Sequence, residues 1–210
     1  MTEEPMLEEL KKKQKKNVKV ILYVLGGVLL VFLLAFFLLN KLLLKDNQKE
    51  EDIRFYPVTD ENIFENSQYV SKNRTIYYCD NSAGYEHTTP ITEENRGDYD
   101  ADVVFAETYL NTIILGDESA LRQMCSQSYL EKNPISDFTQ QMLYDICIYT
   151  YRTEHLDGGD RLVTYKLMYK FYQNNGTYRR DVGSDGARPE YLVLRVSRDG
   201  SSIKIDDILR

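Results

Sequence analysis

A run of twenty residues without a charge lies near the N-terminus of the 210-residue chain, from Val20 to Leu39. It reads VILYVLGGVLLVFLLAFFLL and is almost entirely apolar. At about 1.5 Å per residue, a helix of this length covers about 30 Å, the thickness of the hydrocarbon core of a bilayer. A protein of this size has no need for so long a helix that is apolar on every face. We therefore predict a transmembrane helix within residues 18–43, with the bilayer as its partner.

Basic residues flank this segment unevenly and predict its orientation. Six Lys precede it and three follow it. Because an excess of basic residues stays on the cytoplasmic side, residues 1–17 are expected to form a short charged tail in the cytoplasm, with the C-terminal part exported. The apolar run is longer than the core of a cleaved signal peptide, and no small-residue cleavage site follows it. We expect a retained signal anchor and a single-pass protein of the cell membrane.

Charge differs sharply between the two parts of the chain. Residues 1–49 contain nine Lys and five acidic residues, whereas residues 50–210 contain 17 Lys and Arg against 28 Asp and Glu, a net charge of −11. A body this acidic repels phosphate backbones, so nucleic-acid binding is not expected. The chain is 42% hydrophobic and 12% aromatic, which is too apolar for a disordered chain despite a mean hydropathy of −0.47. We expect a packed domain in the exported part.

Residues 44–96 are expected to form a stalk followed by irregular structure. A charged connector over 46–52 precedes Pro57 and a polar stretch. Tyr69-Val70 and the run from Thr75 to Tyr78 flank Lys72-Asn73, which predicts a short hairpin at this point.

Residues 97–210 begin with a helical pattern. Apolar residues recur at spacings of three and four from Val103 to Leu115, which predicts an amphipathic helix. Three aspartates at 98, 100 and 102 suit the positive N-terminal end of this helix. The same spacing resembles the start of a calcium loop, but the loop's Gly is absent and Tyr109 stands where the bidentate Glu is expected. Helix capping is therefore the preferred interpretation.

Two further helices are predicted after this one. Gly116-Asp117 ends the first helix and caps a second, whose apolar stripe includes Leu121. The helical pattern stops around Asn133-Pro134, because a residue before proline disfavours the helical conformation. A third short helix is expected to begin near Ser136 or Asp137.

The remaining residues alternate between apolar and polar side chains, as half-buried strands do. The clearest strand runs from Val163 to Phe171, and an earlier one begins with Met142, Tyr144, Ile146 and Ile148 on its inward face. Later strands cover Tyr191–Ser197 and Ser202–Ile208. Turn signals at 157–160, 174–176 and 199–200 join them as consecutive antiparallel strands. The expected fold class is α+β, with two or three helices packed on a curved antiparallel β-meander.

The helix over Val103–Leu115, the Gly116-Asp117 break, Tyr129-Leu130 and the last two strands resemble the nuclear-transport-factor-2-like superfamily. The resemblance implies a cone-shaped α+β fold over residues 97–210, with helices packed across a bent sheet. A membrane helix followed by such a domain is similar to the bitopic scaffold subunits of bacterial type IV secretion and conjugation channels. That family carries an Asn-Pro-x-Gly motif, of which Asn133-Pro134-Ile135-Ser136 keeps the first two residues and lacks the Gly. Fold does not settle function in this superfamily, which includes enzymes, binding proteins and scaffolds.

Few residues offer catalytic or metal-binding chemistry. His87 lies in an irregular stretch and His155 beside a turn, and no Cys/His cluster suggests a metal site. Enzymes of the superfamily place an Asp, Tyr or His in the mouth of the cone, and Asp145 is the one acid inside an apolar strand, where burial would raise its pKa. Its strand neighbours already form the inward face, so Asp145 is expected to point outward. We expect no catalytic residue, no metal, no cofactor and no enzymatic activity.

Tyrosine is unusually frequent, with sixteen of the 17 residues outside the apolar segment. A Tyr-rich concave sheet can hold a ligand or a partner peptide through its large ring faces and polar tips. Tyr149, Tyr165, Tyr169 and Tyr191 are the candidates for such a surface. The alternative is that they are core and rim residues of a fold without Trp.

All three cysteines, Cys79, Cys125 and Cys147, lie in the part predicted to be exported. A bridge between Cys125 and Cys147 would join a helix to the sheet and would leave Cys79 single. Cys125 and Cys147 also fit the apolar stripes as buried thiols, which is the alternative.

Together these features predict a non-enzymatic scaffold or assembly component of a bacterial envelope or secretion complex. Its expected partners are other envelope proteins or further copies of itself, bound through the sheet face or the membrane helix. The alternative is a ligand-binding sensor whose cone holds an apolar small molecule or a cell-wall fragment. A pocket enzyme built on Asp145 and nearby tyrosines is the third hypothesis.

Overall fold

The computed structural model describes residues 53–59, 61–80 and 87–210, and the predicted tail, the transmembrane segment and the first residues of the stalk lie outside this part. The helices are α2 (Ser67–Val70), α3 (Ala101–Leu115), α4 (Glu118–Met124) and α5 (Gln127–Lys132). The strands are β1 (Ile76–Asp80), β2 (His87–Pro90), β3 (Leu143–His155), β4 (Arg161–Phe171), β5 (Glu190–Val196) and β6 (Ile203–Leu209). Short 3-10 turns cover Ile63–Glu65 and Arg96–Asp98. The predicted α+β class is confirmed.

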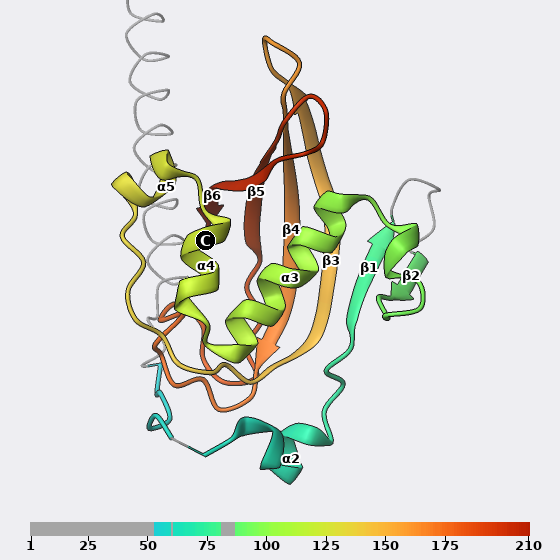
Figure 1. Ribbon diagram of the computed structural model, residues 1–210. Coiled ribbons are helices and arrows are strands. Elements are labelled where there is room, and N and C mark those ends of the chain that lie inside the picture. The colour runs from blue at the N-terminus through green and yellow to red at the C-terminus, as the bar shows by residue number, and fades with distance from the viewer. Residues whose placement is uncertain (1–52, 60, 81–86) are drawn as a thin grey trace, which may run out of the picture. The chain divides into compact units, whose positions relative to one another are not determined.

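The described strands form one mixed sheet in the order β2-β1-β3-β4-β5-β6 (Figure 1). β3 to β6 are consecutive antiparallel neighbours, so the predicted meander is confirmed for this part of the sheet. β1 instead runs parallel to β3 and antiparallel to β2, which corrects the expectation of a wholly antiparallel sheet. Parallel strands need a long crossover, and α3, α4 and α5 lie in the chain between β1 and β3.

The hairpin predicted around Lys72-Asn73 is wrong in its first half, because residues 67–70 form α2. The side chain of Asn66 caps this helix by accepting hydrogen bonds from the backbone N–H groups of Gln68 and Tyr69, at 3.1 and 3.0 Å. Tyr69 is fully buried, and its hydroxyl donates to the backbone carbonyl of Leu143 at 3.0 Å. Capping and burial outweigh the β-propensity of Tyr69-Val70.

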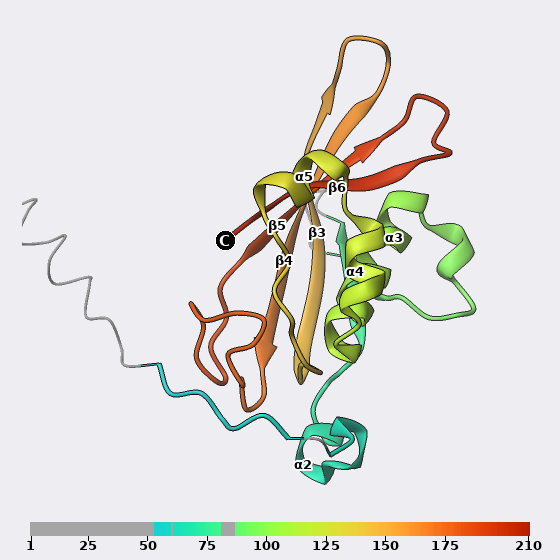
Figure 2. The same cartoon turned by 60° about the vertical axis from the view of Figure 1, so that its left-hand side comes forward.

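α3 crosses one face of the sheet, and α4 and α5 continue towards β6 (Figure 2). α3 ends at Gly116, whose φ of 68° is left-handed and readily adopted by glycine. Asp117 then caps α4 by accepting a hydrogen bond from the backbone N–H of Ala120 at 2.9 Å. The predicted break between the first two helices is confirmed.

The third helix begins about nine residues earlier in the chain than expected. The hydroxyl of Ser126 accepts a hydrogen bond from the backbone N–H of Tyr129 at 3.2 Å, so α5 starts at Gln127 and ends at Lys132. Residues 133–142 are not helical, and no helix begins near Ser136 or Asp137. The serine cap supplies a start signal that the apolar spacing alone does not carry.

A bulge changes the predicted inward face of β3. Its pairing with β4 shifts between Tyr144 and Cys147, and Asp145 takes a φ of 50° at this point. Leu143 therefore joins the core, whereas Met142 is only partly buried and Tyr144 is buried outside the core. A one-residue bulge moves side chains to the other face and leaves no mark in an alternating sequence pattern.

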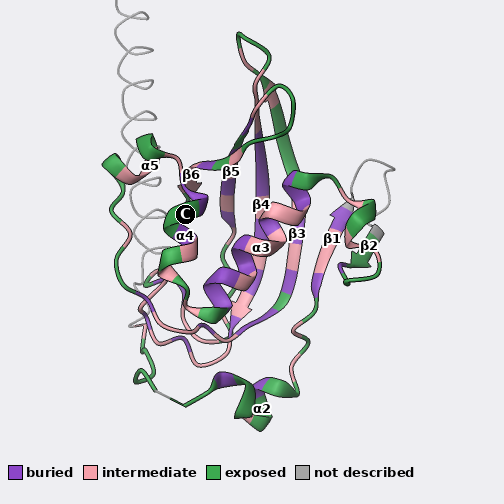
Figure 3. Cartoon of the chain, in the orientation of Figure 1, coloured by how far each residue is buried: buried purple, intermediate pink, exposed green. Residues whose placement is uncertain are grey.

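The core fills the space between α3 and the sheet (Figure 3). The inward side chains of β4 are Val163, Tyr165, Leu167, Tyr169 and Phe171, as the alternation predicts. Those of β5 are Glu190, Leu192, Leu194 and Val196, and the buried side of α3 opposite them includes Ala106, Tyr109, Leu110 and Ile113. We call the other face of the sheet, away from α3, the outer face. Across residues 53–59, 61–80 and 87–210, the helices are too short or too polar to cross a bilayer.

Candidate functional site

The four tyrosines predicted as a binding surface lie on both faces of the sheet. Tyr165 and Tyr169 are each 2% exposed and belong to the core. Tyr149 and Tyr191 are partly buried on the outer face, where the ring of Tyr191 meets that of Tyr151 with 5.0 Å between centroids. The structure does not bring the four together, and two of them are core residues, as the alternative interpretation proposed.

The structure also separates Cys125 from Cys147. Cys125 lies in the core beside Ile205 of β6, and burial raises the pKa of its thiol to about 11. Cys147 lies on the outer face of β3, where its Sγ is 2.7 Å from the Sγ of Cys79 on β1. Cys125 is thus a buried thiol, and Cys147 approaches Cys79 instead.

The remaining polar residues considered for catalysis or metal binding are Asp145, Asp102 and the two histidines. Asp145 is exposed, as expected, with a carboxylate oxygen 3.0 Å from the Lys170 ammonium. Asp102 is 4% exposed in the first turn of α3 and lies 3.6 Å from the Arg161 guanidinium. The described residues contain no group of three or more Asp, Glu, His or Cys side chains that could hold a metal ion. His155 is exposed, and the side chain of His87 is outside the described part.

A groove of about 760 Å³ lies between α5 with its following loop, the loop joining β4 to β5, and the end of β6. Its apolar and aromatic lining consists of Leu121, Tyr129, Pro134, Ile135, Phe138, Tyr178 and Ile208. Its charged lining consists of Lys132, Asp137, Arg180 and Arg210. The groove thus combines aromatic walls with three cations and one anion.

Two of these cations are available to a partner. Within the described part of the chain, neither Lys132 nor Arg180 forms an ion pair with a carboxylate. Both residues are exposed, and Arg180 is held to the groove wall by a hydrogen bond from its Nε to the backbone carbonyl of Gly176 at 3.2 Å. The groove therefore presents net positive charge on a domain whose overall charge is strongly negative.

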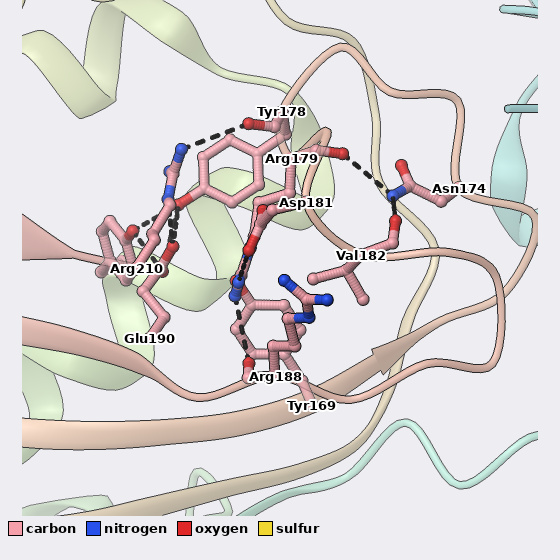
Figure 4. Close-up of polar contacts among 10 residues, drawn as sticks. Tyr169, Asn174, Tyr178, Arg179, Asp181, Val182, Arg188, Glu190 and Arg210 are labelled. Carbon is pink, nitrogen blue, oxygen red and sulfur yellow. Dashed lines mark hydrogen bonds and ion pairs between the residues drawn. The ribbon is translucent and has the colours of Figure 1, made fainter. Parts of the chain in front are cut away.

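A buried carboxylate supports the floor of the groove (Figure 4). The side chain of Glu190 is 1% exposed, and it accepts hydrogen bonds from the Tyr109 hydroxyl at 2.7 Å and the Arg210 Nε at 2.8 Å. The Tyr178 hydroxyl donates to both carboxylate oxygens, at 3.1 and 3.2 Å, and also contacts the Tyr109 hydroxyl. The Arg210 guanidinium lies over the Tyr178 ring, 4.6 Å from its centroid. These bonds fix the two groove-lining side chains, Tyr178 and Arg210, in place.

The loop from 172 to 189 is ordered by buried polar side chains rather than by the tight turn predicted at 174–176. Arg179 is 1% exposed; its Nε donates to an Asp181 oxygen at 3.0 Å, and its Nη1 to the backbone carbonyl of Arg188 at 3.1 Å (Figure 4). The Asn174 amide donates to the backbone carbonyls of Arg179 and Val182, at 3.0 and 2.6 Å. The Arg179 hydrogen bond also lowers the pKa of Asp181 below its ordinary value. This loop forms one wall of the groove.

The buried phenols of this network keep their protons at neutral pH and can donate them to the Glu190 carboxylate. Burial, and then the Glu190 charge, raises the pKa of Tyr109 and of Tyr178 well above the ordinary value of 10.0. Both phenols therefore stay protonated, and the Glu190 carboxylate is saturated by their hydroxyls and by Arg210. The network therefore forms a fixed floor for the groove. A partner would be recognised by the shape of the groove, by its aromatic rings and by its cationic side chains.

The residues of this site were missed in the sequence, although one signal was present. Glu190 stands two residues before Leu192, so the alternation of β5 places it on the inward face. A buried carboxylate there needs hydrogen-bond donors or a cation beside it. Arg179 and Arg180 lie in an irregular loop, where no periodicity indicates which of the two is buried.

Comparisons of the chain with protein-family models, with curated proteins and with solved structures found no match.

Proposed function

We propose that the protein is a membrane-anchored, non-enzymatic scaffold or assembly component of a bacterial envelope or secretion complex. In this proposal Val20–Leu39 holds the chain in the bilayer, and the domain that follows binds partner proteins outside the cytoplasm. The observation that carries it is the filled interior of the domain. A sensor for an apolar ligand needs an enclosed cavity, whereas the space between α3 and the sheet is occupied by side chains such as Tyr109, Tyr169 and Leu192, which are at most 2% exposed.

The groove is the proposed partner-binding site. A protein segment that carries carboxylates beside apolar or aromatic side chains would match its unpaired cations, Lys132 and Arg180, and its rings, Tyr129 and Tyr178. The rigid floor supports this role, because side chains that are already fixed lose little entropy when a partner binds.

The family assignments remain proposals of the same kind. The packing of α3 across the sheet and the final β5–β6 pair support the nuclear-transport-factor-2-like resemblance. The similarity to bitopic scaffold subunits of secretion and conjugation channels rests on the Asn133-Pro134 pair and on the predicted membrane helix.

A second candidate function is a ligand-binding sensor, and the groove volume favours it. About 760 Å³ falls within the range of roughly 300–1,000 Å³ that small-molecule sites occupy. The polar and cationic lining suits an anionic ligand, such as a cell-wall fragment bearing carboxylates, better than an apolar molecule.

Crosslinking and affinity capture of the full chain from native membranes tests the scaffold. We expect one reproducible set of envelope proteins with the unaltered chain and loss of that set with Arg180→Glu, which reverses a groove charge. The matched control is Arg198→Glu, an equal change on an exposed turn away from the groove, which should retain the set. Recovery of the bait alone would contradict the scaffold. Thermal stabilisation of the purified chain by muropeptides would then support the sensor.

A further inference from the structure

Two cysteines meet on the outer face of the sheet, where β1 and β3 pair in parallel. β1 and β3 are aligned so that Tyr77 lies beside Cys147 and Cys79 lies beside Tyr149. The two cysteines are therefore diagonal neighbours on the same face, and their Sγ atoms are 2.7 Å apart. Among the described residues, the third cysteine, Cys125, lies on the core side of the domain.

From this geometry we propose that Cys79 and Cys147 form a disulfide that fastens β1 to β3. A separation of 2.7 Å is well inside the contact distance of two unbonded sulfur atoms and lies within an ångström of the covalent S–S length of about 2.05 Å. Bond formation therefore requires the two sulfur atoms to approach each other by less than an ångström.

A weak hydrogen bond between two thiols is the competing interpretation of this contact. Such a bond to sulfur is long, as the 3.8 Å between the Cys79 Sγ and the Thr88 Oγ1 illustrates. The two sulfur atoms lie more than an ångström closer than that. The pairing leaves Cys125 as a buried thiol, whose pKa is raised by burial to about 11.

Thiol–disulfide exchange can form this bond in two balanced steps. Cys147 is the more exposed of the pair, so its thiolate attacks one sulfur of an incoming disulfide and releases one thiol. The Cys79 thiolate then attacks the Cys147 sulfur of the mixed disulfide and releases the second thiol. Two protons and two electrons pass from the cysteines to the oxidant disulfide. A compartment outside the cytoplasm, which the proposed function requires, supplies such disulfides.

The bond would strengthen a junction of the sheet that has few aligned residue pairs. β1 is aligned with β3 at four residue pairs, whereas β3 and β4 are aligned at ten. A covalent link between Cys79 and Cys147 would join β1 directly to β3, the longest described strand of the sheet.

The test is a redox titration of the purified full chain in detergent with reduced and oxidised glutathione. After acid quenching, thiols are alkylated in denaturant with N-ethylmaleimide, and the digest is analysed by mass spectrometry. We expect a cross-linked peptide pair containing Cys79 and Cys147, with Cys125 recovered as the alkylated thiol. The oxidised chain should also resist proteolysis before β3 several-fold better than the reduced chain.

Serine variants identify the partners. Cys125→Ser should keep the cross-link, and Cys79→Ser or Cys147→Ser should abolish it. Full alkylation of all three cysteines at every glutathione ratio would overturn the proposal, as would a bridge that includes Cys125 or glutathione adducts on Cys79 and Cys147 without a cross-link. The titration of the unaltered chain decides the matter even if a variant fails to fold. It uses purified protein, so its outcome does not depend on whether the scaffold has partners.

Discussion

Replacing Glu190 with Gln tests the buried network beneath the groove. The carboxylate accepts hydrogen bonds from Tyr109, Tyr178 and Arg210, and its side chain is 1% exposed. Gln keeps the shape but removes the charge and replaces one of the two acceptor oxygens with a donor, so the three donors lose part of their acceptor set. A hydrogen bond to a charged group contributes about 1.5–3 kcal/mol, and a buried pair loses about 3–5 kcal/mol when one partner is removed. The Arg210 side chain is 36% exposed, so water screens part of this loss.

We therefore expect Glu190→Gln to lower the free energy of unfolding by about 2–4 kcal/mol, which for a domain of this size corresponds to a fall in Tm of roughly 4–16 °C. Urea unfolding and thermal melts of the full chain, followed by circular dichroism, measure both quantities. The control is Glu118→Gln, which removes a helical pair with Arg122 whose side chains are 28% and 45% exposed, and should cost less than about 0.5 kcal/mol. Equal losses in the two variants would refute the argument that Glu190 is a buried, multiply bonded charge.

Three further predictions concern the fold and the sheet face. Gly116→Ala should lower the free energy of unfolding by at least about 1–2 kcal/mol, because the φ of Gly116 is left-handed and the added Cβ would lie 2.6 Å from a backbone nitrogen. The control is Gly97→Ala, whose Cβ would meet no atom within 4 Å and which should leave the free energy of unfolding unchanged. Urea titration measures both variants. Burial raises the pKa of Tyr69 and of Tyr129 from 10.0 to about 12, so their protonated side chains contribute to stability in full below pH 10, and this contribution is lost as the pH rises towards 12. Unfolding free energies and phenolate absorbance measured between about pH 9 and 12 check the direction of the effect. Unfolding free energies that do not change across this interval would contradict it. Asp145→Asn should change neither the melting temperature nor the captured partners, since the side chain is exposed and Asn also tolerates its positive φ; loss of partners would show that the outer face takes part in binding.

Periodicity and capping signals predicted most of the fold after residue 97. Helices, helix caps and strands depend mainly on residues close together in the chain, so a local pattern can predict them. Examples are the helical spacing from Val103 to Leu115, the Gly116-Asp117 break and the alternation from Val163 to Phe171. The parallel placement of β1 depends on a contact with β3, about seventy residues away in the chain, so no local pattern carries it. The bulge at Asp145 could not be predicted from the sequence either, because one extra residue in a strand has no compositional signature.

The candidate site was harder to predict than the fold. Tyr165 and Tyr169 were predicted as candidates for a binding surface, with a place in the core as the alternative, and the alternation of β4 buries both of them in the core. The groove is assembled from three separate segments, and its rigid wall depends on Arg179 being buried while its neighbour Arg180 is exposed. Which of the two is buried depends on how the loop folds back on itself, because the partners of Arg179 are Asp181, the backbone carbonyl of Arg188 and the Tyr169 hydroxyl, at separations of two, nine and ten residues.

Site-specific photo-crosslinking in living cells tests the scaffold proposal most directly. A benzophenone amino acid replaces Lys132 on the rim of the groove or, as the control, Arg198 on the exposed turn between β5 and β6. The proposal predicts a discrete adduct with an envelope protein from position 132 and none from position 198. The absence of a protein adduct from position 132 at normal levels of the chain, or equal adducts from both positions, would contradict a partner-binding groove.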